Sequence, residues 1–193
     1  MNLDLDRCAR DIEEARLRAQ SLVSDLPLGQ LTKQPEPGKW SVAECLLHLN
    51  TTADVVQSLV EKAIAEGKRN NTAGRGPFGI GLKGRLLVWI AEPPPKFRIR
   101  APRSVRPPSQ IENPLRLLPD FLKAQDEWER LVRESAGLDL GKIMVGARFS
   151  AFRARLAAIW PWMMAHQRRH LLQAENVKRQ ILSAPSKAAA QVS

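Results

Sequence analysis

Apolar residues recur at helical spacing in four long stretches of the chain, and this pattern leaves few folds other than a helix bundle. The stretches are about residues 4–26, 42–67, 114–135 and 150–181. Each amphipathic helix must bury its apolar stripe against another element, and 193 residues suffice for one core without disulfide support. The sequence therefore predicts an all-α four-helix bundle in which residues 1–183 form a single domain.

Several residues mark the expected ends of these helices. Ser41 and Glu44 match a capping box at the start of the second helix, and Gly67 and Gly137 are the expected terminators of the second and third. The predicted buried face of the third helix consists of Leu115, Leu118, Leu122, Trp128, Leu131 and Val132. Pro161 falls within the fourth stretch, where we expect either a kink or a fresh helix start.

A long crossover, residues 67–113, joins the second and third helices and is rich in glycine and proline. An apolar run at residues 86–90 interrupts it. Because a structureless connection of that length is uncommon in a compact domain, we expect one short helix that lays its apolar side on the core. A β-hairpin is the alternative, and residues 184–193 are expected to be a disordered tail.

The net charge of +10 is unevenly distributed. Residues 68–106 carry 10 basic groups against Glu92 alone, and residues 148–193 carry 8 against Glu175 alone, whereas the other segments are acidic. We expect no recognition helix in the basic crossover, and few aromatic residues lie among its basic ones, so a nucleic-acid binder is the hypothesis that the sequence supports least. The crossover could instead attract an anionic thiol or acidic substrate, or form a solvated loop.

The cysteines and the amino terminus bear on the compartment. Cys8 and Cys45 are too few for a disulfide framework, and Cys45 falls inside an apolar helical pattern typical of a buried free thiol. The amino terminus is charged throughout, and no stretch approaches the length of a membrane span. We therefore expect a soluble cytoplasmic protein with no membrane partner.

The three histidines of the chain carry its clearest chemical signal. His166 and His170 stand four residues apart in a strongly helical segment, so both imidazoles lie on one helix face. His48 lies on the expected inner side of the second helix. A bundle readily brings two inner faces together, and three imidazoles sharing one cation would satisfy three buried polar rings. The alternative is that these are ordinary exposed or core-edge histidines.

A site with three neutral nitrogen ligands leaves an open position on the ion, which is typical of catalytic rather than structural metal centres. The protease motif HExxH does not apply, because residue 167 is Gln where that chemistry needs Glu. Imidazole suits zinc, nickel, copper and iron alike. The sequence therefore does not identify the metal.

Polar neighbours of the histidines have two interpretations each. Glu44 could support the site, but its capping role explains it fully. Gln173 lies one turn beyond His170 and could orient a metal-bound ligand or be a plain surface residue. Thr51 and Thr52 could hydrogen-bond a metal-bound water or pack on the helix face.

Larger neighbours are expected to be structural. Trp40 precedes the N-cap as a hydrophobic staple would, and Trp162 and Met163 are expected in the pocket wall or core. Arg168 and Arg169 should point away from the histidine face, toward solvent or an interface.

Two segments resemble a known family. Residues 38–49 read GKWSVAECLLHL, and residues 165–173 read AHQRRHLLQ. The first closely resembles the G-K-W-S-x-x-E-x-x-x-H-L signature of the DinB/YfiT-like family of metal-dependent four-helix proteins, and the second resembles the closing H-x-x-R-H-x-x-Q segment of that family. The resemblance implies that His48, His166 and His170 bind zinc, nickel or a similar divalent ion.

The same resemblance guides the expected function. Characterised relatives include S-transferases that use bacillithiol or mycothiol and a mycothiol-dependent maleylpyruvate isomerase, and dimers are common, which leaves a homodimer open. We expect a metal-dependent enzyme of the thiol S-transferase type that acts on a small molecule, with a low-molecular-weight thiol as cosubstrate. A hydrolase has less support, because no carboxylate other than Glu44 lies within one turn of a histidine on its own face. The alternative is a non-catalytic metal- or ligand-binding stress-response protein.

Overall fold

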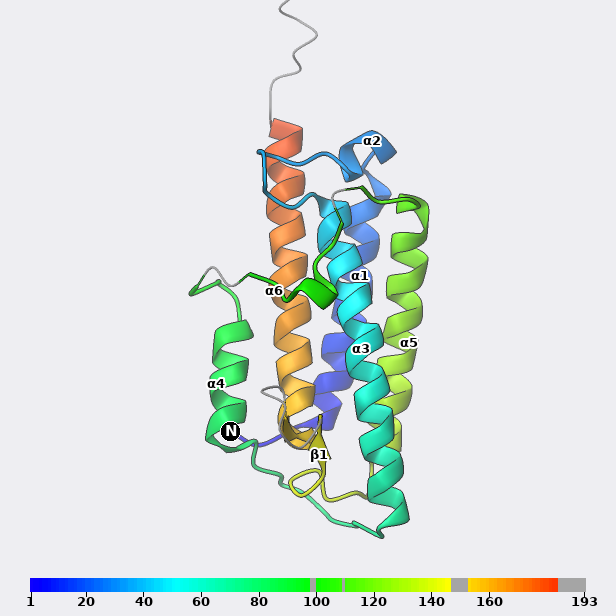
Figure 1. The fold of residues 1–193 in the computed structure, drawn as a ribbon, viewed down its shortest axis with the longest axis vertical. Coiled ribbons are helices and arrows are strands. Elements are labelled where there is room, and N and C mark those ends of the chain that lie inside the picture. The colour runs from blue at the N-terminus through cyan, green and yellow to red at the C-terminus, as the bar shows by residue number, and fades with distance from the viewer. Residues whose placement is uncertain (98–99, 109, 147–152, 184–193) are drawn as a thin grey trace, which may run out of the picture.

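Four long helices lie side by side in the computed structural model, which describes residues 1–97, 100–108, 110–146 and 153–183 (Figure 1). The helices are α1 (Leu5–Ser24), α3 (Val42–Arg69), α5 (Leu117–Glu134) and α6 (Leu156–Ser183). Both α1 and α3 pack against α5 and α6. The first two long helices, α1 and α3, therefore lie diagonally opposite each other in the bundle. The predicted all-α four-helix bundle is confirmed.

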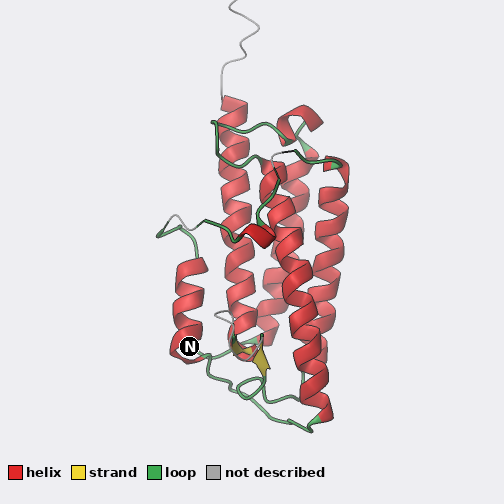
Figure 2. Cartoon of the chain, viewed as in Figure 1, coloured by secondary structure: helices red, strands yellow, loops and turns green. Residues whose placement is uncertain are grey.

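Shorter elements complete the fold (Figure 2). They are α2 (Leu28–Leu31), α4 (Gly81–Ala91), the 3-10 turns η1 (Arg103–Val105) and η2 (Pro114–Arg116), and the strands β1 (Met144–Val145) and β2 (Ala154–Arg155). The strands pair antiparallel, with Met144 opposite Arg155. Neither α2 nor this strand pair was predicted, because elements this short carry no periodic pattern.

The helix ends follow the local signals in part. In the capping box, Ser41 Oγ accepts from the backbone N–H of Glu44 at 3.1 Å, and Glu44 Oε2 accepts from that of Ser41 at 2.7 Å. The predicted terminator Gly67 is wrong, since α3 continues to Arg69. A Cβ at Gly67 would lie 2.5 Å from Ile143 Cδ1, so this glycine permits close packing.

Two further expectations about the helices need correction. Leu115 is 70% exposed because it lies in η2, before α5 begins. The last helix runs continuously through Pro161, so a fresh start there is wrong, and a kink stays a prediction. Residue 150 lies outside the described residues, but the predicted start is too early, since β2 occupies Ala154–Arg155 and α6 begins at Leu156. The predicted tail, residues 184–193, also lies outside the described residues.

The crossover contains the expected helix, α4, and not a β-hairpin. It packs against α6, where Gly84 allows close approach: a Cβ at this position would lie 2.6 Å from Ala158 Cβ. Val88 is buried, but Leu86 and Trp89 of the same apolar run are exposed. The predicted apolar side therefore lies on the core only in part.

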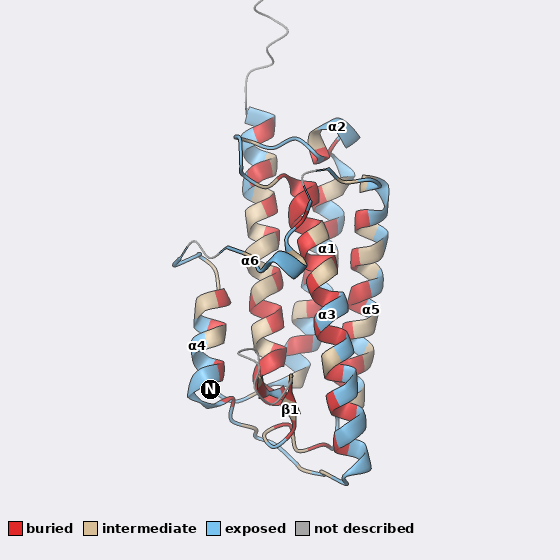
Figure 3. Cartoon of the chain, viewed as in Figure 1, coloured by how far each residue is buried: buried red, intermediate tan, exposed pale blue. Residues whose placement is uncertain are grey.

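Buried side chains face inward on all four long helices and form two clusters along the bundle (Figure 3). On α3, one cluster ends at Leu49 and the other begins at Ala53. On α6, the boundary falls between Ala165 and Leu171. All three histidines lie at this boundary, so the bundle places a polar layer between two apolar cores.

None of the described helices is long and apolar enough to cross a membrane.

Candidate metal centre

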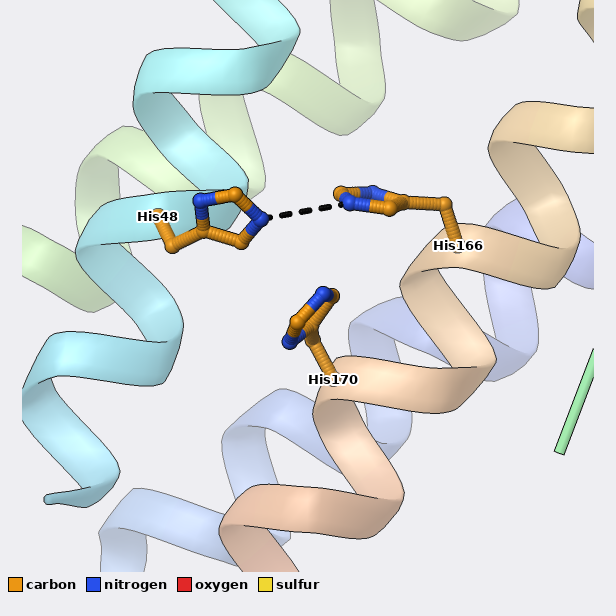
Figure 4. Close-up of side chains that lie close together, drawn as sticks. All are labelled: His48, His166 and His170. Carbon is orange, nitrogen blue, oxygen red and sulfur yellow. Dashed lines mark hydrogen bonds between the residues drawn. The ribbon is translucent and has the colours of Figure 1, made fainter. Parts of the chain in front are cut away.

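His48, His166 and His170 converge from two helices on one point (Figure 4). A ring nitrogen from each lies within 4.8 Å of the others, and Nε2 of His48 lies 3.2 Å from Nε2 of His166. Figure 4 shows the ring of α3 facing the two rings that α6 presents one turn apart. The structure therefore brings together all three residues that the sequence singled out.

The spacing suits a transition-metal ion. Zinc–nitrogen bonds of about 2.0–2.1 Å in tetrahedral geometry separate neighbouring ligand nitrogens by about 3.3 Å. The His48–His166 distance of 3.2 Å matches this value. Three protein ligands would also leave a fourth position open to an exogenous ligand. These residues could hold one divalent ion.

Hydrogen bonds fix the orientation of two of the rings. Nδ1–H of His48 donates to the backbone carbonyl of Val105 at 2.7 Å, and Nδ1–H of His170 donates to Gln173 Oε1 at 3.0 Å. Both partners are acceptors, so each ring carries its proton on Nδ1 and turns the lone pair of Nε2 toward the centre. Metal-binding histidines typically have such an outer partner.

His166 differs from the other two rings. Its Nδ1 is buried and has no hydrogen-bond partner among the described residues. Its Nε2 lies 3.2 Å from His48 Nε2, which presents a lone pair. Without an ion, His166 would donate Nε2–H to His48 and leave the lone pair of its own Nδ1 buried without a donor. A cation at the centre would satisfy this arrangement, which makes the donor set fit a metal.

The site keeps its imidazoles neutral. Burial lowers the pKa of His48, and the hydrogen bond to Val105 offsets this only in part. Burial and the two neighbouring histidines hold the pKa of His166 well below its ordinary value. Burial and His48 lower the pKa of His170 to about 3. Metal ligation requires neutral imidazole, so the rings have the right form at neutral pH.

Two tryptophans line the histidine layer. The centroid of the Trp40 ring lies 5.0 Å from the centroid of the His48 ring and 5.8 Å from that of the His170 ring. Trp162 stacks on His166 at 5.6 Å. Trp162 is the predicted pocket wall, and Trp40, expected only as a helix staple, contributes a second wall.

The nearby polar side chains are mostly engaged elsewhere. Both oxygens of Glu44 accept from Gln34 Nε2 at 3.0–3.1 Å, in addition to the cap, which leaves this carboxylate little capacity as a base. Thr51 Oγ1 donates to the carbonyl of Leu47 within its own helix. Thr52 Oγ1 is buried and has no hydrogen-bond partner among the described residues. Of the predicted polar neighbours, Gln173 is the one with a described hydrogen bond to a histidine ring.

Arg168 and Arg169 correct the expectation of solvated positions. Arg168 lies between Asp11 at 2.8 Å and Glu92 at 2.7 Å, and its side chain is mostly buried. Arg169 donates to the carbonyls of Ile90 and Phe97 at 3.0 and 2.8 Å. These residues fasten α4 and the following loop to the helix that carries two of the histidines.

Arg168→Ala is expected to destabilise the protein by about 1–3 kcal/mol, because it leaves Asp11 and Glu92 without their partner in a half-buried setting. Urea unfolding would measure this change, and trypsin should cut the crossover faster as α4 loosens. Arg130→Ala is the matched control. Arg130 pairs with Glu61, Glu127 and Glu134 at the surface, so its loss should cost less than about 1 kcal/mol. Equal effects of the two variants would contradict the assignment.

Gln173→Ala is expected to weaken metal binding by about 10–100-fold, the usual effect of removing the outer partner of a ligating histidine. Competition with a chromogenic chelator would measure the affinity. Gln180→Ala, an exposed position two turns further along α6, should leave it unchanged. An unaltered affinity in Gln173→Ala would show that Gln173 does not orient His170.

Sequence reasoning missed the Val105 carbonyl. A backbone acceptor has no residue signature, and Val105 is separated from His48 by 57 positions in a proline-rich segment. Only the fold of the crossover, which passes in front of α3 and α6 as η1, brings this carbonyl to the site (Figure 1).

Comparisons with known proteins agree with this architecture. A solved structure similar to this chain is that of YfiT from Bacillus subtilis, described as "a probable metal-dependent hydrolase with an unusual four-helix bundle topology". The match has 14% sequence identity and a TM-score of 0.61, and it covers 93% of this chain and 89% of YfiT. No curated protein matches the sequence significantly. The model of the DinB superfamily matches residues 11–174, and the chain therefore belongs to the DinB superfamily.

Proposed function

We propose that this protein binds one divalent metal ion through His48, His166 and His170 and acts as a metal-dependent enzyme of the thiol S-transferase type. The observation that carries the proposal is the convergence of three imidazole nitrogens within 4.8 Å, with two of the rings held by outer hydrogen bonds. His48 is buried, and His166 and His170 are of intermediate exposure. The proposal requires that an exogenous ligand reach the ion beside these two side chains.

The chemistry would be divided between the ion and the chain. When bound, a divalent ion supplies Lewis acidity that lowers the pKa of a thiol and favours the nucleophilic thiolate at neutral pH. The carbonyl of Val105 and the amide of Gln173 orient the ligating rings. Trp40 and Trp162 cover the imidazoles with apolar surface and restrict water.

The reacting thiol would come from outside the chain. Cys8 and Cys45 are both buried, and burial raises the pKa of the Cys8 thiol to about 12 and that of Cys45 further still. Neither side chain can supply a thiolate at neutral pH. A low-molecular-weight thiol as cosubstrate follows from this.

The charge around the site favours an anionic cosubstrate. Arg103 and Arg106 are exposed on either side of Val105, whose carbonyl contacts His48. Exposed cations at the mouth of a site raise the local concentration of anions. We therefore favour a thiol or electrophile that carries a carboxylate or phosphate.

Hydrolysis is the second candidate, because YfiT is described as a probable metal-dependent hydrolase. A metal-dependent hydrolase usually needs a general base beside the attacking water. Glu44, one turn before His48, is held by Ser41 and Gln34. This engagement makes hydrolysis the less favoured reaction.

The test compares metal-free protein with protein loaded with zinc or nickel, the two ions we favour. Each form would be mixed with monochlorobimane and cysteine, glutathione, bacillithiol or mycothiol, and with nitrophenyl esters in parallel. We expect conjugation to be accelerated only by the loaded protein, beyond the rate with free metal. Ester cleavage without conjugation would favour hydrolysis. Bound metal with neither activity would favour a non-catalytic metal-binding protein.

A further inference from the structure

Helix α4 exposes an apolar stripe on its outer face. Leu82, Leu86 and Trp89 follow one another at the spacing of one helix face and are 83%, 54% and 49% exposed. Phe97 extends the stripe, since its ring lies 5.8 Å from that of Trp89 and is also half exposed. The opposite face of α4 packs against α6, so the stripe is additional to the core contact.

Basic side chains surround this stripe. Lys83 and Arg85 are exposed on α4 itself, and Lys83 Nζ donates to the carbonyl of Arg153. Lys96 Nζ donates to the carbonyls of Trp89 and Glu92 and lies 5.2 Å from the centre of the Trp89 ring. The only acidic residue of the segment from 68 to 106 is Glu92, and its carboxylate is bound by Arg168. No acidic side chain of this segment therefore offsets the positive charge.

The stripe also has a defined position on the bundle. Arg169 holds the carbonyls of Ile90 and Phe97, and Arg168 holds Glu92, so both ends of the exposed aromatic pair are fastened to α6. A surface that is already ordered loses little conformational freedom when it binds.

We propose that α4 and Phe97 form a docking surface for anionic lipid membranes. Leucine, tryptophan and phenylalanine side chains enter the boundary between headgroups and acyl chains, and flanking lysine and arginine side chains contact lipid phosphates. The earlier expectation of no membrane partner rested on the lack of a spanning segment, which an interfacial surface does not need.

A second copy of the chain fits this surface less well. A symmetric dimer across the stripe would bring the basic residues of both copies close together, and these like charges would repel. The stripe offers on the order of 400 Å² of apolar surface, below the roughly 800 Å² per partner of a stable interface. Charge complementarity therefore favours an anionic lipid surface.

Sedimentation with vesicles tests the proposal on the full chain. Vesicles of phosphatidylcholine alone would be compared with vesicles in which half the lipid is phosphatidylglycerol, at low and high salt. We expect at least about ten-fold stronger partitioning onto the anionic vesicles, lost at high salt, because each basic side chain near the surface contributes to binding. The tryptophan emission of the protein should also shift to shorter wavelength, because Trp89 leaves water when it enters the lipid.

Two variants isolate the stripe. Leu86→Ser combined with Trp89→Ser should reduce partitioning at least about ten-fold, since both side chains supply buried apolar area. Leu17→Ser is the matched control, because Leu17 is a similarly exposed leucine on α1, at 58%. Circular dichroism would check that each variant is folded.

Three results would overturn the proposal. They are partitioning that is absent even at low salt, partitioning equal on both vesicle types, and partitioning that survives the double substitution. Sedimentation velocity would measure the oligomeric state of the parent and of the double variant. A dimer in the parent that the double substitution dissociates would overturn the proposal and show that the stripe binds a second copy of the chain. None of these outcomes depends on the metal centre, so they do not bear on the proposed enzyme activity.

Discussion

Replacing His166 with alanine is expected to reduce bound metal from about one equivalent to almost none. Nε2 of His166 faces Nε2 of His48, and His170 stands one turn further along the same helix as His166. Losing one of three ligands should lower affinity by more than about 100-fold, since removing an outer partner alone costs about 10–100-fold. That corresponds to a loss of at least about 2.7 kcal/mol of binding free energy.

Metal analysis by inductively coupled plasma mass spectrometry would measure this loss on untagged protein purified without chelators. Gln180→Ala, on the exposed side of the same helix, serves as the control that should keep its metal. Circular dichroism would show whether His166→Ala is still helical. Equal metal content in the parent and His166→Ala would refute the three-histidine site, and so would a lack of metal in the parent after reconstitution with zinc and nickel.

The candidate metal centre was predictable to the extent that it depends on helix periodicity. His166 and His170 share a face because the spacing of four residues fits the helical repeat, and His48 follows the apolar face of its own helix. Each of these positions is a property of a single helix. The bundle then needs only to bring two inner faces together.

The parts of the site that depend on the crossover were not predictable. The Val105 carbonyl reaches His48 only because the described part of the crossover around η1 passes over the bundle, and that path follows from contacts distant in sequence. The contacts of Arg168 and Arg169 could not be predicted for the same reason. Helix geometry correctly separates them from the histidine face, but it cannot show that Asp11, Glu92 and two backbone carbonyls, one in α4 and one in the loop after it, occupy the space beyond.

The exposed stripe on α4 has a related origin. The apolar run at residues 86–90 predicts a helix against the core, and the contact with α6 is indeed made through Gly84 and Val88. A helix with apolar residues on both sides can bury only one of them against a single neighbour. Sequence alone did not indicate which side would remain free.

Trp128→Ala is expected to lower the free energy of unfolding by about 3–5 kcal/mol, the usual cost of removing a large buried aromatic side chain. Trp128 is fully buried and meets Trp160 edge to face at a centroid distance of 5.8 Å. A domain of this kind is stable by only about 5–15 kcal/mol, so this one change removes much of the total. With a urea slope near 2 kcal/mol/M, the unfolding midpoint should fall by about 2 M.

Trp89→Ala is the matched control for this change, because Trp89 is 49% exposed and its removal should cost less than about 1 kcal/mol. Adding metal distinguishes a loss of stability in the apolar core from a loss of metal binding at the histidines. At 100 times the dissociation constant, metal should stabilise both the parent and Trp128→Ala by about 2.7 kcal/mol, but not His166→Ala. A Trp128→Ala protein that is folded but gains nothing from metal would show that this core contact also holds the histidine layer together. Equal stabilisation would show that the apolar core below the histidines and the metal centre contribute independently.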